Sequence, residues 1–278
     1  MSIQSPHLTT SVRRHRDDHN IHCATTTPIK TNVTPSATSP KTDDPSLKST
    51  WSHRVWVATG CTTILASLAS AVVGSVNEHI WIKPILSGFI GYLFADLGSG
   101  VYHWAIDNYG DASTPVFGFQ IDAFQYHHKW PWAITISEFA NRLHVIGRII
   151  TFTVTPLYLI FHDQPVVMGF VGVASGCIMF GVQIHAWAHG TKRKLPWIVV
   201  ALQDVGVFIS PSHHAAHHQP PYSNSYCIVS GVWNRFLDEY KVFEALEMVL
   251  FLKLGLRPRS WSEPNSDRRK EAEESPVM

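Results

Sequence analysis

The chain has 278 residues, enough for one or two domains, and its 22 basic and 21 acidic residues give a net charge of +1. This balance excludes the basic footprint of a nucleic-acid-binding protein. The four cysteines show no paired spacing, which excludes a disulfide framework and a cysteine-type zinc site and favours a reducing compartment.

The first 50 residues differ in composition from the rest of the chain. They contain 17 Ser or Thr residues and almost no aliphatic run, so they bury too little apolar surface to offset the entropy of ordering. We therefore predict disordered tails over residues 1–50 and 266–278, on either side of a membrane domain over 51–265. Three arginines near residue 14 are typical of a plastid transit peptide, whereas the aspartates nearby are not. Composition leaves both a transit peptide and a plain tail open.

Four apolar segments follow. Residues 55–76 carry no charge, and as a helix rising about 1.5 Å per residue they would extend about 33 Å, more than a hydrocarbon core of about 30 Å. The others are residues 84–106, 145–161 and 165–186. The third is at the lower limit of length and almost adjoins the fourth, so this pair either crosses twice or forms a re-entrant hairpin.

Candidate metal ligands follow the same segments in paired spacing. The second segment contains H-x3-D, a His pair comes after it, the fourth segment ends in H-x3-H, and H-H-A-A-H-H lies beyond. These residues are His103, Asp107, His127, His128, His185, His189, His213, His214, His217 and His218. When the crossings are counted in turn, every one of them falls on one face of the membrane, and a re-entrant hairpin gives the same result.

The charges in the loops predict which face this is. The loops on the histidine side contain Lys192, Arg193 and Lys194, whereas the short loops on the other side offer only Lys83 as a base. Because basic residues concentrate on the side that is not translocated, the histidines are expected on the cytosolic or stromal face.

Two further helices are expected after the crossings. Residues 195–210 are apolar but only 16 long and contain Gln203 and Asp204, which favours an interfacial helix over a span. Residues 242–256 form another helix candidate. The predicted fold class is therefore an all-α membrane protein, with about four transmembrane helices plus interfacial helices that carry a His-rich di-metal site on one face.

The number of ligands indicates two metals. Residues four apart share one side of a helix, so the pairs His103–Asp107 and His185–His189 should converge. A single zinc needs three or four protein ligands, and this chain offers more than twice as many. Asp96 lies seven residues before His103 on the same stripe, where a structural role and a ligand role are both open.

The identity of the metal is less constrained. Imidazole suits zinc, copper, iron and nickel, but a nitrogen-rich shell without cysteine favours iron and oxygen chemistry. A zinc hydrolase would normally place a Glu base beside its ligands, and no H-E-x-x-H occurs. The alternatives to an oxygen-using enzyme are a membrane zinc hydrolase of the ceramidase type and a His-rich metal transporter.

Five segments closely resemble the Kua and plasmanylethanolamine desaturase family, and within it the plastid fatty acid desaturase 4 type. The resemblance covers about residues 50–265. The segments are DLGSGVYHWAIDNYGD (96–111), FQYHHKWPW (124–132), QIHAWAHGTKRKLP (183–196), LQDVGVFIS (202–210) and HHAAHHQPPYSNSYCIVSGVWN (213–234).

The resemblance implies a membrane enzyme with two iron ions that uses dioxygen and two electrons to insert a double bond into a lipid-bound acyl chain. In the type named above, the product is a trans-3 double bond in palmitate on phosphatidylglycerol, ferredoxin is the electron donor, and the site faces the stroma of the chloroplast. The family's functional histidines map onto all the histidines of the set above except His213, with Asp107 in the first box. His213 is an additional member that the family pattern H-x-x-H-H does not require.

Overall fold

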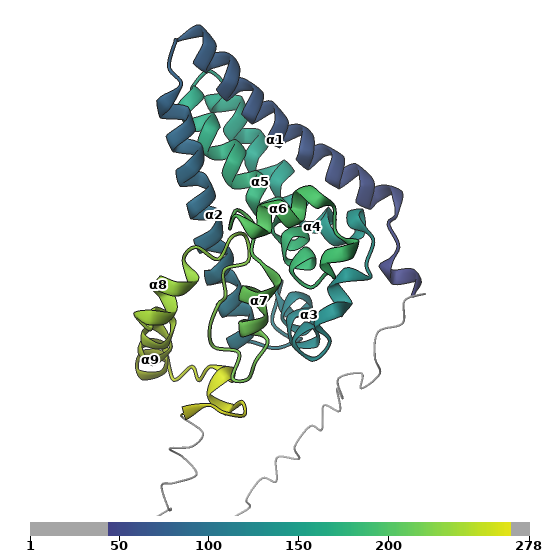
Figure 1. The fold of residues 1–278 in the computed structure, drawn as a ribbon, viewed down its shortest axis with the longest axis vertical. Helices are drawn as coiled ribbons and strands as arrows, with labels where there is room; N and C mark the ends of the chain where they lie inside the picture. The colour runs from purple at the N-terminus through teal and green to yellow at the C-terminus, as the bar shows by residue number, and fades with distance from the viewer. Residues whose placement is uncertain (1–43, 268–278) are drawn as a thin grey trace, which may run out of the picture. The chain divides into compact units, whose positions relative to one another are not determined.

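The structure is a computed structural model that describes residues 44–267, and in this range it contains helices and no strand. Four helices are long, namely α1 (Trp51–Asn77), α2 (Ile82–Asn108), α4 (Phe139–Phe161) and α5 (Pro165–Ala188) (Figure 1). Each is long and apolar enough to cross a membrane. The predicted fold class is confirmed.

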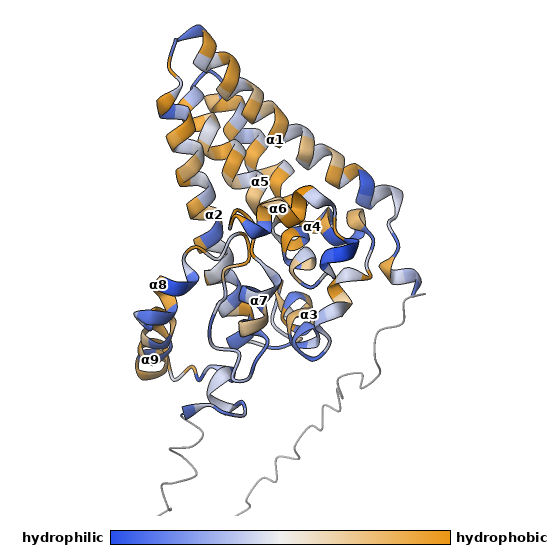
Figure 2. Ribbon diagram, in the orientation of Figure 1, coloured by the Kyte–Doolittle hydropathy of each residue, from blue (hydrophilic) through white to orange (hydrophobic). Residues whose placement is uncertain are grey.

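The outward faces of the long helices are apolar. Leu65 of α1, Phe89 of α2 and Phe152 of α4 are each more than half exposed. Figure 2 shows hydrophobic residues along the length of these helices and hydrophilic segments around their lower ends. Such extended apolar exposure is expected of surfaces that face lipid, where exposure of a Leu or Phe side chain carries no hydration cost.

Small residues allow the long helices to approach closely. Helix α1 packs against α4 and α5, and α2 packs mainly against α5. A Cβ at Gly60 of α1 would lie 2.9 Å from the carbonyl oxygen of Gly147 in α4, and the hydroxyls of Thr59 and Thr151 are 3.1 Å apart. Close backbone contact and interhelical hydrogen bonds are the ordinary means of helix association in lipid, where the hydrophobic effect does not drive it.

The third segment is longer than its sequence suggested. Helix α4 begins at Phe139, six residues before the predicted start at residue 145, and its 23 residues would extend about 34 Å. The polar first turn explains the difference, because Arg142 is half-buried and donates to the side-chain oxygen of Gln183 in α5 at 2.6 Å. Both α4 and α5 are therefore long enough to cross, and neither needs to be re-entrant.

Five shorter helices complete the described chain, with 3-10 turns between them. They are α3 (Gly118–Lys129), α6 (Trp197–Asp204), α7 (Pro211–His217), α8 (Asn234–Glu239) and α9 (Val242–Leu254). Helix α9 matches the predicted helix over 242–256. Helix α6 is shorter than the helix predicted over 195–210, because the chain leaves the helical conformation before Gly206, which has φ +77°.

The folded part begins before the predicted boundary at residue 51. The 3-10 turn Pro45–Leu47 lies against the start of α4, where the Glu138 amide donates to the Leu47 carbonyl at 2.9 Å. The Ser49 amide donates to the Glu138 carboxylate at 2.8 Å. Residues 45–50 thus belong with the membrane domain. Residues 1–43 and 268–278 lie outside the described residues.

Candidate metal centre

Nine of the ten candidate ligands come together at one end of the long helices. They form two adjacent groups, and within each group the possible ligand atoms all lie within 4.8 Å of one another. The five-histidine group contains His127, His185, His189, His214 and His218, and the mixed group contains His103, Asp107, His128 and His217. The rings of His103 and His185 are 5.8 Å apart, so the two groups are neighbours.

Four helices supply these side chains. Helix α2 brings His103 and Asp107, and α5 with its C-cap brings His185 and His189. The adjacent pair at the end of α3 is divided between the two groups, since His127 belongs to the five-histidine group and His128 to the mixed group. Figure 1 shows α3 and α7 beside the lower end of α2, where these segments meet.

Helix α7 determines which histidines of the H-H-A-A-H-H run are buried in the two groups and which is exposed. Its C-terminal turn buries His214 and His217, with His218 as the C-cap, and these three enter the groups. His213 is exposed and belongs to neither group. His213, although it is part of the run, therefore does not join His217 in the mixed group.

The mixed group surrounds a buried carboxylate that has no hydrogen-bond donor. One Asp107 oxygen lies 3.3 Å from Nε2 of His103, 3.4 Å from Nε2 of His128 and 3.2 Å from Nε2 of His217. Both Asp107 oxygens and His103 Nε2 are buried and make no hydrogen bond. A buried carboxylate that faces only imidazole nitrogens, without a well-oriented donor, is costly unless a cation compensates it, so the donor set fits a metal ion.

Two backbone carbonyls set the tautomers of this group. Nδ1 of His103 lies 2.9 Å from the carbonyl oxygen of Tyr226, and Nδ1 of His217 lies 2.8 Å from that of Asn224. A carbonyl only accepts, so Nδ1 must carry the proton in both rings. Each Nε2 is thereby left as the atom with the lone pair, and it lies 3.2–3.3 Å from an Asp107 oxygen, as metal ligation requires.

In the five-histidine group, ring nitrogens converge on one another. His185 Nε2 is 3.1 Å from His127 Nε2 and 3.2 Å from His189 Nε2, and His214 and His218 Nε2 are 3.1 Å apart. Two nitrogens that bind one ion at about 2.1 Å and at right angles to each other lie about 3 Å apart. The spacing of these atoms therefore fits neighbouring positions around a single ion.

Four histidines of the five-histidine group are held in the neutral form that binds metals. Burial, and then repulsion from neighbouring imidazoles, lowers the pKa of His189 to about 4 and that of His218 to about 2. The same causes lower the pKa of His127 and His214. Ligand nitrogens must be unprotonated, so a set that is neutral at pH 7 gives up no proton when an ion binds.

Asp96, whose role the sequence left open, is structural. Its Oδ1 accepts backbone N–H bonds from Val229 at 3.2 Å, Ser230 at 2.8 Å and Gly231 at 3.0 Å. It is fully buried and belongs to neither ligand group. Asp96 of α2 therefore anchors the segment that follows Tyr226, the residue whose carbonyl contacts His103.

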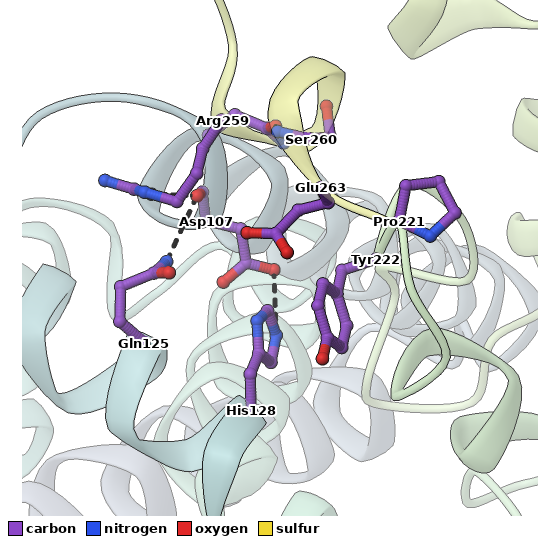
Figure 3. Close-up of a pocket in the computed structure, with 9 residues that line it drawn as sticks. Asp107, Gln125, His128, Pro221, Tyr222, Arg259, Ser260 and Glu263 are labelled. Carbon is purple, nitrogen blue, oxygen red and sulfur yellow. Dashed lines mark hydrogen bonds and ion pairs between the residues drawn. The ribbon is translucent and has the colours of Figure 1, made fainter. Parts of the chain in front are cut away.

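The sequence analysis missed the supports at the end of α2. The carbonyl of Asp107 accepts from the Arg259 guanidinium and, at 3.1 Å, from Gln125 Nε2 (Figure 3). Arg259 also donates to the Gly110 carbonyl at 2.6 Å. Nearby, Glu247 accepts from the indole of Trp104 at 3.0 Å. No local signal points to these pairs, because most of the partners lie more than 140 residues apart.

Comparisons with known proteins agree with this geometry. Residues 92–261, which include all nine grouped residues, match the family model of the lipid desaturase domain. Fatty acid desaturase 4, chloroplastic, of Arabidopsis thaliana is 63% identical over 224 residues, which cover 81% of this chain and 69% of the relative. Plasmanylethanolamine desaturase 1 of Mus musculus is 32% identical over 188 residues, covering 63% and 68%. No solved structure matches the chain.

Proposed function

The chain belongs to the lipid desaturase family and is a membrane fatty acyl desaturase, and we propose that it works with two iron ions. The five-histidine group would hold one ion and the mixed group the other. The ions would supply the redox chemistry, namely uptake of electrons and activation of dioxygen.

The observation that carries this proposal is the buried Asp107 carboxylate without a donor, set among three imidazole nitrogens and beside five more. A site for one zinc would need about four ligands and would leave the remainder unexplained. The absence of thiolate from both groups favours iron over metals that prefer sulfur.

The reaction balances with one external donor. Two hydrogens leave adjacent carbons of the acyl chain, and a carbon–carbon double bond forms. Dioxygen takes up these hydrogens together with two electrons from a one-electron donor and two protons from solvent, which gives two waters. The histidines would hold the two ions for this step. His103, His185 and His217 are almost completely buried, so the centre is also shielded from water.

The relatives support a chloroplast location, and the resemblance to the plastid desaturase type supports the choice of lipid and electron donor. Three proteins that are 55–63% identical to this chain are named chloroplastic fatty acid desaturases of the type 4 group, which supports a chloroplast membrane for this chain too. We propose phosphatidylglycerol as the lipid, the trans-3 position of palmitate as the site of the double bond, and ferredoxin as the donor. Lys192, Arg193 and Lys194 follow the ligand end of α5, which supports a stromal orientation for the metal centre.

Expression in a plastid that lacks this desaturase, followed by acyl analysis of each lipid class, tests the proposal. The chain should restore a double bond in one class. His217→Ala should abolish the product, whereas His213→Ala, a change in the same helix but outside both groups, should leave it unchanged. Purified protein should contain two iron ions. Zinc in their place, or a product from the His217→Ala variant, would refute the assignment.

A further inference from the structure

An apolar cavity of about 470 Å³ adjoins the five-histidine group, and its volume lies within the range of small-molecule binding sites. Five separate parts of the chain line it: the turn before α1, helix α3, the turn after α3, helix α5 and the segment near residue 228. Among the titratable side chains that line it, His127 and His185 are possible metal ligands.

The lining changes from exposed to buried along the cavity. Asp44 and Ala123 are exposed, whereas His127, His185 and Ile228 are buried. The cavity therefore connects the molecular surface with the interior of the metal centre. Asp44 directly precedes the turn that leads into α1, so the outer part lies at the level where this span enters the bilayer.

Helix geometry explains why the cavity reaches the metal site. Ala123 and Phe124 come four and three residues before His127 in α3, and Val182 comes three residues before His185 in α5. Residues three and four apart share a helix face, so the turn before each ligand faces the same space as the ligand. A molecule in the cavity would contact this apolar turn and then the imidazoles.

The pocket beside the mixed group has a different character. Its lining includes the charged or polar side chains of Asp107, His128, Arg259 and Glu263 beside Tyr222, and its volume is only about 10 Å³ (Figure 3). An extended hydrocarbon gains nothing there, because its burial would desolvate charged groups without replacing their hydrogen bonds. The two sides of the centre therefore differ in the ligand that each can admit.

We propose that the apolar cavity binds the acyl chain of the substrate, with the two carbons that lose hydrogen beside His127 and His185, and that Ala123 and Val182 determine how the chain fits. The proposal rests on the desaturase function above and adds which side of the centre the substrate occupies. Hydrogen removal then takes place at the edge of the five-histidine group, and the mixed group lies away from the chain.

Photo-crosslinking tests this occupancy without turnover. Phosphatidylglycerol with a diazirine in the middle of its palmitoyl chain is incorporated into nanodiscs with the full-length protein, with and without iron, and the labelled peptides are mapped by mass spectrometry. Labels are expected on the cavity lining, in α3 before His127 and in α5 before His185. Labels confined to lipid-facing positions such as Ile178 would overturn the proposal.

A matched pair of variants in α5 gives the second test. Val182→Trp fills the cavity, whereas Ile178→Trp places the same ring one turn earlier, at an exposed position outside the cavity lining. Val182→Trp should retain two irons and lose at least tenfold in product, and Ile178→Trp should behave as wild type. Ala123 is exposed and tolerates a larger side chain, so Ala123→Trp provides an independent test if Val182→Trp does not fold. It should also lower the amount of product.

The outcomes separate the two proposals. Wild-type rate and product from both Val182→Trp and Ala123→Trp, with iron bound, would overturn the cavity assignment and leave the desaturase function intact. Labels in the cavity of a wild-type protein that forms no double bond would support the cavity and refute the proposed lipid reaction.

Discussion

Replacement of Asp107 by Asn tests the metal centre most directly, because it removes one charge and almost no volume. The carboxylate is 5% exposed and faces three imidazole nitrogens at 3.2–3.4 Å. Loss of one member of a buried charge pair costs about 3–5 kcal/mol, which corresponds to roughly 10²- to 10⁴-fold weaker binding of an ion in the mixed group. We expect iron to fall from two to one per chain and the product to disappear.

In the metal-free protein, Asp107→Asn should not lower the thermal stability. Without an ion the Asp107 carboxylate is buried and has no donor, and such an orphan costs about 1–3 kcal/mol or more. Asp107→Asn should therefore leave the melting temperature of the iron-free protein unchanged or raise it, while it lowers that of the iron-loaded protein. The assay is thermal unfolding in detergent at a fixed protein concentration, with iron determined on the same samples. Two irons per chain in the variant would refute the assignment of Asp107.

Three other changes test the surroundings of the site. In the metal-free protein, stability measured by thermal unfolding should fall as pH decreases from about 6.5 toward 4, because the pKa of His189 is lowered to about 4 and the unfolded chain takes up the proton first; a flat profile would contradict this. Asp96→Ala leaves three backbone N–H groups without their acceptor and should destabilise the protein by about 3 kcal/mol or more, measured as a fall in melting temperature, whereas an unchanged melting temperature would show that Asp96 is no anchor. Arg259→Ala should weaken iron binding about 10- to 100-fold in a chelator competition, and Arg259→Lys should restore little of it because one ammonium cannot span the carbonyls of Asp107 and Gly110; full iron affinity in the alanine variant would exclude a supporting role.

The sequence predicted the parts of this protein that depend on local pattern. Four apolar segments could be recognised from length and charge alone, and each corresponds to a long helix. The spacing of four in His103–Asp107 and His185–His189 correctly predicted that each pair converges, because helix geometry alone brings such residues together. Two boundary errors occur where polar residues are satisfied by partners, as with Arg142 at the start of α4 and Ser49 before α1. A third occurs at the end of α6, where the chain leaves the helix before Gly206.

The sequence could not predict how the candidate ligands divide between two groups. His127 and His128 are adjacent, yet one contacts His185 and the other contacts His217, and only the tertiary arrangement of α3, α5 and α7 decides this. The same limit applies to His213, which has the spacing of a ligand but lies on the exposed side of a two-turn helix.

The supports of the site are hidden for a related reason. His103 is held by the Tyr226 carbonyl, that segment is held by Asp96, and the end of α2 is held by Arg259, so three links join α2 to chain more than 120 residues away. Each link uses a backbone group on one side, and a backbone group leaves no mark in the sequence of its partner. Helix α2, which supplies two of the candidate ligands, His103 and Asp107, thus depends for its position on residues after 225. We expect this C-terminal part to be as necessary for iron binding as the histidines themselves.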